Sequence, residues 1–504
     1  MPSFGALERG QGDGVNPGAS GGRGLKGACG VLTCLLLLAC EPEMPVARVL
    51  PPSPRTGEPA PPGAQPPPQE EPLPPEPTGR SWYVSPNGSD AATGTSEAPL
   101  RTIGRAAALA GPGEIIRVLP GVYPEELVLE SRGTGVAPIT LRGEGSPRPT
   151  IVPKDRTRSA VIRVRGSWNL ENLHVDVGGA RMAAILFDSE ARQSFLSGSE
   201  LNGGTSGAGV LVEGARDITL RNNAIHHFIK SGDDSHGVAV VGPSRNITLR
   251  GNDIHHNSGD SIQCEQGDAP ADTVLIEGNI LHDSGENGVD IKWCQHVTVR
   301  DNQLFGFPNT AIRQAGTSAG EAVVIQDSAR DILIRGNSIS RAGRGVSVLG
   351  GDNPPANVSV EGNHVQEIRN FPEGNGQGIR IASARSARVE GNTVEDTASY
   401  GLMLAADGQV VTGLVARNNT VRGGSQLLLL RLGDEPFRPG LVMEENLYVQ
   451  GGILKADGVL ETLQGEDARF LGDFPGDRLT LSSPEKLEVW RQVLGVEQGS
   501  GLLE

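Results

Sequence analysis

Two groups that can exchange a proton lie close together in the stretch SGENGVDIKWC, residues 284–294. Asp290 and Lys292 are two residues apart in a segment that alternates apolar and polar side chains, so both point to the same face of a predicted strand. An amine flanked by carboxylates can serve as a general base. The same pair on an exposed strand can be a surface salt bridge, which stabilises a protein by about 1 kcal/mol or less. The neighbouring elements decide between these two interpretations.

A repeat surrounds this stretch and is the strongest pattern in the chain. Segments such as ITLRNNAIHH (218–227) and ITLRGNDIHH (247–256) alternate apolar and polar residues, turn at an asparagine and become apolar again. The aligned asparagines are Asn223, Asn252, Asn279, Asn302, Asn337, Asn363, Asn392, Asn419 and Asn446. We expect these asparagines to adopt left-handed turn conformations and to form a ladder of side-chain amides between stacked coils.

Each unit also carries a second strand, for example HGVAVVG (236–242) and NGVDIKW (287–293). Two or three strands in a coil of about 27 residues predict a parallel β-helix. We therefore expect an all-β solenoid of about 10–12 coils over residues 81–455. Its N-terminal end would be capped by a short helix over Ile103–Ala110.

The C-terminal segment 456–504 would form a cap. Within it, SSPEKLEVWRQVLG (482–495) begins with the Ser-Pro-Glu pattern that is typical of a helix start. We expect this helix to close the open end of the solenoid.

The segments before the repeat indicate an exported protein. The run CGVLTCLLLLAC at 29–40 is too short for a membrane-spanning helix and has the length of a signal-peptide core. Its end, LLAC, resembles a bacterial lipobox, which would make Cys40 the lipid-modified first residue after cleavage. The proline-rich segment 41–80 would be an extended spacer. We expect 1–40 to be a signal peptide, and the mature protein to be an outer-membrane lipoprotein of a bacterial cell envelope or an extracellular protein.

The composition restricts the kinds of molecule that the protein can bind. The formal net charge of −16 argues against nucleic acid, because binding a phosphate backbone needs a basic surface. It is compatible with an acidic ligand that is bound with the help of a cation. We expect a monomer.

Two cysteines lie in the repeat region. Cys264 should point inward, and Cys294 lies three residues beyond Ile291, the position aligned with Cys264. Because this offset is unfavourable for a disulfide, we expect two buried free thiols.

Aligning the second strands gathers polar residues into one patch. The inward residues that fall in register are Val238, Ile262, Val289, Ile312, Val346 and Ile379. On each strand, the residue that follows the inward one then points outward. Strands of adjacent coils lie about 4.8 Å apart, so these outward residues are neighbours. The outward patch consists of Gln263, Glu265, Asp290, Lys292 and Arg313, with Asp260, Glu286 and Asn287 at the neighbouring corner. Arg380 lies farther along the same column. This clustering favours a functional site over an isolated surface pair.

The segment that starts at Trp82, WYVSPNGSDAATGTSEAPLRTIGRAAALAGPGEIIRVLPGVYPE, resembles the N-terminal cap of secreted right-handed parallel β-helix proteins. These include family 9 polysaccharide lyases of the pectate lyase-like superfamily. Lys292 followed one coil later by Arg313 resembles the Lys-then-Arg arrangement of chondroitinase B and of alginate lyases with this fold. The resemblance implies a right-handed β-helix that binds an acidic polysaccharide and cleaves it by β-elimination.

The resemblance also implies roles for the patch. Lys292 would be the base, and Arg313 would stabilise the uronate carboxylate as it becomes enolate-like. Many such lyases use Ca²⁺ held by acidic side chains and asparagine. The implied calcium ligands are Glu265, Asp290, Glu286 and Asp260, and the implied substrate-binding residues are Gln263, Asn287 and Arg380.

Two other functions remain open. The stretch KSGDDSHG (230–237) resembles pieces of polygalacturonase-type glycoside hydrolases, which pair carboxylates to protonate the glycosidic oxygen and activate water. The alternative acid–base residues would be Asp233, Asp234 and His236, together with Asp260. A non-catalytic carbohydrate-binding or surface scaffold protein is the third possibility.

Histidines recur at one repeat position, in IHH at 225–227, in IHH at 254–256 and at His282. Stacked histidines can bind a transition metal ion. They can also form a ladder at a turn with no ligand.

Overall fold

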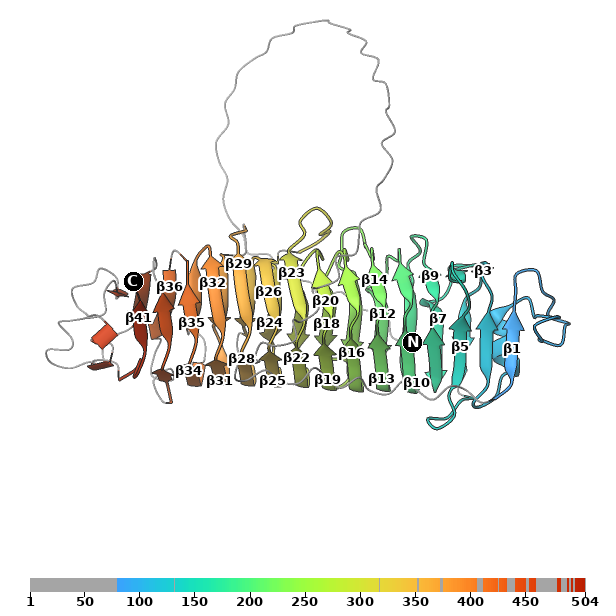
Figure 1. The fold of residues 1–504 in the computed structure, drawn as a ribbon, viewed down its shortest axis with the longest axis horizontal. Helices are drawn as coiled ribbons and strands as arrows, with labels where there is room; N and C mark the ends of the chain where they lie inside the picture. Colours follow the sequence, from blue (N-terminus) through green and yellow to red (C-terminus); the bar gives the residue numbers. More distant parts are fainter. Residues whose placement is uncertain are drawn as a thin grey trace, which may run out of the picture. The chain divides into compact units, whose positions relative to one another are not determined.

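A computed structural model describes residues 79–130, 132–316, 318–350, 353–371, 375–405, 411–424, 426–432, 440–449, 453–458, 478–481, 487–488, 491–492 and 495–503. From residue 79 onward, the described chain forms an all-β parallel solenoid of about 12 coils with very little helix (Figure 1). This confirms the predicted fold class. The predicted signal peptide (1–40), nearly all of the spacer (41–80) and most of the predicted C-terminal helix (482–495) lie outside the described residues.

A typical coil contributes three strands, and these stack into three sheets. Sheet A consists of β1 (Ser81–Val84), β2 (Ile115–Val118), β5 (Ile139–Gly143), β8 (Trp168–Glu171), the second half of β10 (Ala183–Ser197), β13 (Arg216–Arg221), β16 (Arg245–Arg250), β19 (Asp272–Glu277), β22 (Gln295–Arg300), β25 (Arg330–Arg335), β28 (Ala356–Glu361), β31 (Ala384–Glu390), β34 (Val411–Arg417) and β37 (Val442–Glu444).

Sheet B consists of β3 (Val122–Pro124), β6 (Thr150–Val152), β9 (His174–Asp176), β11 (Glu200–Asn202), β14 (Ala224–His226), β17 (Asp253–His255), β20 (Ile280–His282), β23 (Gln303–Phe307), β26 (Ser338–Ala342), β29 (His364–Ile368), β32 (Thr393–Thr397), β35 (Thr420–Arg422), β38 (Leu447–Val449) and β41 (Gly501–Leu503).

Sheet C consists of β4 (Leu127–Leu129), β7 (Ala160–Gly166), the first half of β10, β12 (Ala208–Glu213), β15 (His236–Val241), β18 (Ile262–Glu265), β21 (Val289–Lys292), β24 (Glu321–Gln326), β27 (Arg344–Val348), β30 (Gln377–Ile381), β33 (Tyr400–Ala405), β36 (Gln426–Leu432), β39 (Ile453–Gly458) and β40 (Arg478–Leu481). Because β10 runs from sheet C into sheet A, these two form one 27-stranded sheet, while sheet B has 14 strands.

One short helix, α1 (Ile103–Leu109), lies where the sequence predicts a helix. Thr102 precedes it in an extended conformation, and its hydroxyl accepts a hydrogen bond from the backbone N–H of Arg105. This N-cap satisfies a donor that the first helical turn leaves without a partner. The helix packs on β1, β2 and β4. None of the helices in the described part of the chain is long and apolar enough to cross a membrane.

The core consists of apolar columns that run from coil to coil. In sheet A, Ile218, Ile247, Val274 and Val297 are partners in register, and all four side chains are buried. Burying one such side chain contributes about 1.5–3 kcal/mol. Because each strand alternates inward and outward residues, this column also fixes which side chains face outward.

The nine aligned asparagines form the predicted ladder. Each Nδ2 donates to the Oδ1 of the asparagine one coil later, at 2.9–3.0 Å. The same Oδ1 accepts the backbone N–H of the preceding asparagine, at 2.8–3.1 Å. At the C-terminal end, Asn446 bonds instead to Ser500 and Glu497.

The left-handed residue at each of these turns is the one before the ladder asparagine, not the asparagine itself. Positive φ angles occur at Asn222 (54°), Gly251 (65°), Gly278 (62°) and Asp301 (56°). These are the residue types that tolerate this conformation. The prediction was wrong on this point because both turn positions carry residues that suit a left-handed turn.

One coil is longer than the predicted register allows. β21 pairs with β24, so Asp290 lies opposite Val324 and Lys292 opposite Gln326. Ile312 and Arg313 therefore lie on no strand of sheet C but in the connection 308–320 between β23 and β24. The prediction was wrong because the alternation in TAIRQAG mimics a strand. The interval from Asn302 to Asn337, the longest in the ladder, was the sign of an insertion.

Cys264 and Cys294 form a disulfide, with Cα atoms 6.3 Å apart. The prediction of two free thiols was wrong. The chain turns at Trp293, whose φ is 61°, and this turn brings Cys294 back into the core beside Cys264. A count along an extended strand cannot foresee such a turn.

Replacing Asn302 by alanine should lower the free energy of unfolding by about 2–4 kcal/mol, because the backbone N–H of Asn279 and the carbonyl of Ile276 lose their partners in the core. Guanidinium unfolding of the full chain measures the change. The control is Asn246→Gly, which removes an exposed hydrogen bond to Asp217 without straining the left-handed backbone at this position (φ 56°) and should cost less than about 1 kcal/mol. Equal losses in both variants would contradict a structural role of the ladder.

Candidate active site

Titratable side chains gather where three consecutive coils of sheet C meet the preceding turns. His236 begins β15, Asp260 lies just before β18, and Glu286 lies in the turn before β21. Asp290 and Lys292 lie on β21 itself, and Asp234 lies in the turn before β15. We call these six residues the sheet C cluster. Asp260, Asp290 and His236 are buried, while Asp234, Glu286 and Lys292 are partly exposed. The partly exposed groups are therefore the ones that a ligand can reach first.

Asp290 and Lys292 form an ion pair on β21. The Lys292 Nζ lies 2.7 Å from the Asp290 Oδ2, and the amide of Gln326 donates to the other carboxylate oxygen at 2.9 Å. Burial and the carboxylate of Asp260 raise the pKa of Asp290 to about 6. Burial lowers the pKa of Lys292, but Asp290 and Asp260 more than offset this and raise it above its usual value. Lys292 therefore keeps its proton at neutral pH.

Asp260 is fully buried and is held from several sides. Its Oδ1 accepts the backbone N–H of Asn287 at 3.1 Å and the Asn287 side-chain amide at 2.9 Å. Its Oδ2 accepts the amide of Gln263 at 3.3 Å. Burial raises the pKa of Asp260, but the bond to His236 and the nearby Lys292 lower it below its usual value. Asp260 is therefore an ionised carboxylate.

The imidazole of His236 rests against Asp260. Its Nδ1 lies 3.0 Å from the backbone N of Asp260 and 3.2 Å from the Oδ2 of the same residue. The first contact uses the lone pair of a neutral ring, and the second needs a proton on the ring. Burial lowers the pKa of His236, but Asp260 and Asp234 raise it above its usual value. The ring can thus hold a proton or release it, with Asp260 orienting it in both states.

Glu286 and Asp234 are the acidic groups nearest the surface. Burial and the carboxylates of Asp260 and Asp234 raise the pKa of Glu286 to about 8. Burial also raises the pKa of Asp234, together with Asp260 and Asp233, against the effect of His236. The Oδ1 of Asp234 is buried and has no hydrogen-bond partner among the described residues. A protonated Glu286 is therefore available as an acid at neutral pH.

Two backbone features hold these groups in place. A Cβ on Gly259 would lie 2.7 Å from the Nδ1 of His236, so only glycine leaves room for the ring. A Cβ on Gly316 would lie 3.3 Å from the Oε1 of Glu286, so the 308–320 connection passes close beside this carboxyl group. Ser318 in that connection donates to the Oδ1 of Asn287 at 2.9 Å. The insertion thus supports the cluster from outside the strand register.

Several predicted residues have other surroundings. Arg313 donates to the carbonyl of Ser318 within its own connection. Arg380 lies on β30, and β24 and β27 separate it from β21. Asp233 is exposed and pairs with Lys230, whose hydrogen bond lowers the pKa of Asp233.

Gln263 and Asn287 lie beside the cluster. Both are largely buried and donate to Asp260, so they position this carboxylate. Gln326 and Ser318 also contact the cluster and were not predicted. Only the length of the insertion pointed to them.

The predicted calcium ligands do not converge on one point. Within the described residues, two groups of acidic and histidine side chains lie close enough together to hold an ion, and both are on sheet B. Asp260, Glu286 and Asp290 are not among them, and Glu265 lies at the end of β18. Calcium binding at the cluster stays a prediction.

Comparisons with known proteins identify the family to which the fold belongs. Profiles of the right-handed β-helix region match residues 160–321 and 317–453, which together are more than half of the chain. A family described as a protein of unknown function matches residues 86–131. The uncharacterized protein YwoF of Bacillus subtilis (strain 168) is 43% identical over 67 residues, which are 13% of this chain and 14% of that protein.

Solved structures have the same fold at low sequence identity. The catalytic unit of a thermostable GH87 α-1,3-glucanase from Streptomyces thermodiastaticus strain HF3-3 is 16% identical, with a TM-score of 0.50 over 69% of this chain and 64% of that one. An alginate lyase from Paenibacillus sp. str. FPU-7 is 19% identical, with a TM-score of 0.37 over 69% of this chain and 95% of that one. At 16% identity the likeness to the glucanase establishes the fold alone. The stacked three-sheet coils and the matched profiles together show that the chain belongs to the right-handed β-helix family.

Proposed function

We propose that the protein cleaves an acidic, uronate-containing polysaccharide by β-elimination, with the sheet C cluster as its active site. The observation that carries this proposal is a cation, Lys292, beside carboxyl groups whose pKa values are pushed in opposite directions. Such separation is typical of sites that donate and accept protons in one reaction. The fold shared with an α-1,3-glucanase and an alginate lyase fits a polysaccharide substrate in a general way.

Lys292 serves this reaction as a charge, not as the base expected from the sequence. Its raised pKa leaves almost no neutral amine at neutral pH. A fixed ammonium group can instead neutralise the carboxylate of a uronate, which lowers the cost of removing the adjacent proton. Its side chain is 32% exposed, so substrate can reach it, while Asp290 holds it in place from below.

His236 is the base that removes the proton from C5 of the uronate. In the neutral ring whose Nδ1–H donates to the Oδ2 of Asp260, the lone pair of Nε2 is free to accept this proton. Asp260 orients the imidazole and stabilises the imidazolium that forms, as a buried carboxylate does in other acid–base pairs. The electron pair of the broken C–H bond moves toward the carboxylate at Lys292. It then forms the C4–C5 double bond as the C4–O bond breaks.

Glu286 supplies the proton for the leaving glycosidic oxygen. Its pKa of about 8 keeps the group protonated at neutral pH. His236 therefore takes up one proton from the substrate, and Glu286 gives one proton to it. The products are an unsaturated uronate and a new hydroxyl group on the departing sugar.

Glycoside hydrolysis is the second candidate. The observation that favours it is the pair of partly exposed carboxyl groups, Asp234 and Glu286, both with raised pKa values. A hydrolase uses one carboxylic acid to protonate the glycosidic oxygen and a second carboxylate to activate water. In the elimination, by contrast, no water enters the product.

Export and lipid anchoring at Cys40 belong to the same proposal. The disulfide between Cys264 and Cys294 supports export, because disulfides persist mainly in oxidising compartments. An anchored enzyme would act on polymers at the cell surface.

Replacing Lys292 by alanine should lower kcat/KM by about 10²–10³-fold, because the uronate carboxylate loses its counter-charge. The assay follows the ultraviolet absorbance of the unsaturated uronate released from alginate, polygalacturonate and glycosaminoglycans. The matched control is Lys230→Ala, which removes a lysine paired with Asp233 outside the cluster and should leave the rate unchanged. New reducing ends without the chromophore would point to hydrolysis. Binding without either product would point to a non-catalytic protein.

The pH profile of kcat/KM should be bell-shaped. Activity rises with pH as His236 loses its proton. This limb lies above the usual pKa of histidine, because Asp260 and Asp234 raise the pKa of His236. Activity falls above about pH 8, where Glu286 loses its proton. In Asp260→Asn the acid limb should move to lower pH, since the carboxylate that favours the imidazolium is gone. An acid limb that does not move in Asp260→Asn would contradict the assignment of His236 as the base.

Metabolic labelling with a palmitate analogue tests the anchor. The wild-type protein, expressed in a Gram-negative host, should be labelled and recovered with the membranes. Cys40→Ala should lose the label, whereas Cys34→Ala should keep it. A labelled Cys40→Ala protein would contradict the assignment of Cys40.

A further inference from the structure

A histidine array lies on sheet B, on the same coils that carry the sheet C cluster. His226, His255 and His282 end the consecutive strands β14, β17 and β20 and are partners in register. His227, His256 and Asp283 follow directly in left-handed conformations, with φ of 58°, 54° and 51°. The left-handed turn keeps this second column beside the first. The result is an array of two columns and three rows, with five imidazoles and one carboxylate.

Within each column the rings of the array are stacked in parallel. His226 and His255 have ring centroids 4.9 Å apart, and His255 and His282 have centroids 4.7 Å apart. In the next coil Phe305 takes the same position and stacks on His282 at 4.9 Å. Stacking alone therefore does not require an imidazole at this position. The histidines call for a second explanation that uses their nitrogen atoms.

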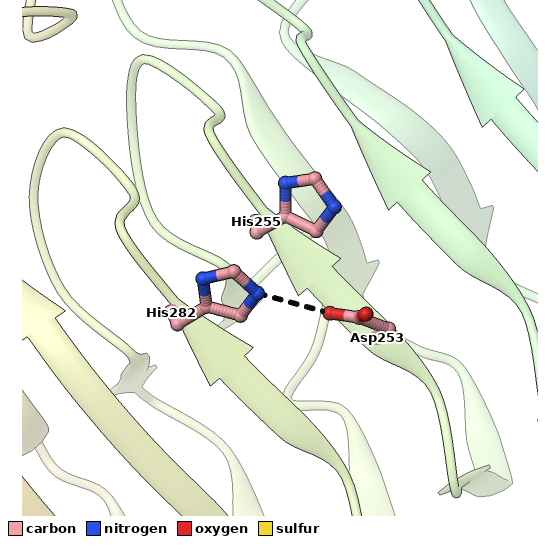
Figure 2. Close-up of side chains that lie close together, drawn as sticks. All are labelled: Asp253, His255 and His282. Atoms are coloured by element: carbon pink, nitrogen blue, oxygen red, sulfur yellow. Dashed lines mark hydrogen bonds and ion pairs between the residues drawn. The ribbon is translucent and has the colours of Figure 1, made fainter. Parts of the chain in front are cut away.

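Asp253 adds a carboxylate to the first column. It begins β17, whose last residue is His255, and its Oδ1 lies 3.2 Å from the Nε2 of His282 in the next coil. Figure 2 shows Asp253 and His282 facing one another, with the ring of His255 beside them. One ligand atom from each of Asp253, His255 and His282 lies within 4.8 Å of the others. All three side chains are partly exposed, so an ion can enter from solvent.

We propose that Asp253, His255 and His282 bind one divalent transition metal ion, with zinc as the reference ion. Two imidazole nitrogens and one carboxylate oxygen are ligands that zinc prefers, and three protein ligands leave a position open for water or a ligand. Bond lengths of about 2.0–2.2 Å require the three atoms to move closer together. Small rotations of partly exposed side chains can supply this movement.

Neighbouring groups hold the two rings in suitable orientations. The Asp283 Oδ2 lies 2.7 Å from the Nδ1 of His282, so this nitrogen can donate a proton to Asp283. The Nε2 of His282, which contacts Asp253 in the absence of an ion, then has a lone pair with which to bind one. The His256 Nδ1 lies 2.9 Å from the Nδ1 of His255, which leaves the Nε2 of His255 for the same ion. A carboxylate that bonds to the outer nitrogen of a histidine ligand is a common support in zinc sites. Asp283 and His256 are therefore positioning residues in this proposal.

The proposal does not depend on the function assigned to the sheet C cluster. The array lies on a different sheet, and no residue is shared between the two sites. Failure of the polysaccharide-cleaving assay would leave the metal site untouched. Failure of metal binding would leave the cluster untouched.

Titration calorimetry of the full chain with zinc chloride tests the site. The protein is freed of any affinity tag and treated with a chelator beforehand. Wild-type protein should bind zinc with a dissociation constant in the micromolar range or below. His255→Asn and His282→Asn should each weaken binding by at least about tenfold, and Asp283→Asn by about tenfold through the loss of orientation. Cobalt in place of zinc should give visible absorption bands that disappear in His282→Asn.

The matched control is His226→Asn, which changes the same column one coil earlier, outside the three ligands. It should bind zinc as the wild-type protein does. Circular dichroism of each variant without metal confirms that it is folded, and Asp283→Asn still tests the site if a ligand variant is unstable. Three results would overturn the proposal: no zinc binding by the wild-type protein, binding unchanged in both ligand variants, or binding lost in His256→Asn but kept in His255→Asn.

Discussion

The ladder of buried asparagine amides sets the register on which the rest of this solenoid depends. Each amide satisfies a backbone N–H and a backbone carbonyl of the preceding coil and donates to the amide of the next coil, so a coil cannot slip without leaving buried polar groups unpaired. Once the register is fixed, the inward columns of isoleucine and valine and the outward columns of polar residues follow from alternation alone. The sheet C cluster and the sheet B histidine array both lie on these strands and in the turns directly beside them. Both therefore owe their geometry to the same ladder.

Electrostatics in the sheet C cluster follow from this stacking. Asp260 comes from one coil and Glu286 and Asp290 from the next, and burial leaves too little solvent around them to screen their charges. Asp260 takes the hydrogen bonds and stays ionised, so its neighbours Glu286 and Asp290 are driven toward their protonated forms. Lys292 is the cation that offsets this charge. The pair that looked like a surface salt bridge is thus part of a buried network, in which breaking one contact leaves charges uncompensated.

Much of this arrangement could be predicted from the sequence, but a few residues were misplaced for identifiable structural reasons. The spacing of Asn223 to Asn446 was sufficient for the fold and the ladder, because a solenoid repeats one local structure. The neighbours Gln263, Asp290 and Lys292 followed from register. Arg313 was misplaced because an insertion breaks the repeat, and Cys294 because a left-handed turn at Trp293 redirects the chain.

Protonation states could not be predicted at all. The role of Lys292 depends on whether burial or the adjacent carboxylates dominate its pKa, and the two effects oppose one another. The burial of Asp260 and Asp290 next to Lys292 decides which effect dominates, and the sequence does not show it. The sequence places His236 only in the hydrolase alternative. Its contact with Asp260 is the observation that makes it the base in the proposed elimination.

A crystal structure of the Glu286→Gln variant with a bound uronate oligosaccharide tests the central claim most directly. The account predicts a sugar carboxylate beside the Nζ of Lys292, C5 of that sugar facing the ring of His236, and the glycosidic oxygen at residue 286. A sugar chain bound on another face of the solenoid, or one whose carboxylates do not reach Lys292, would contradict it.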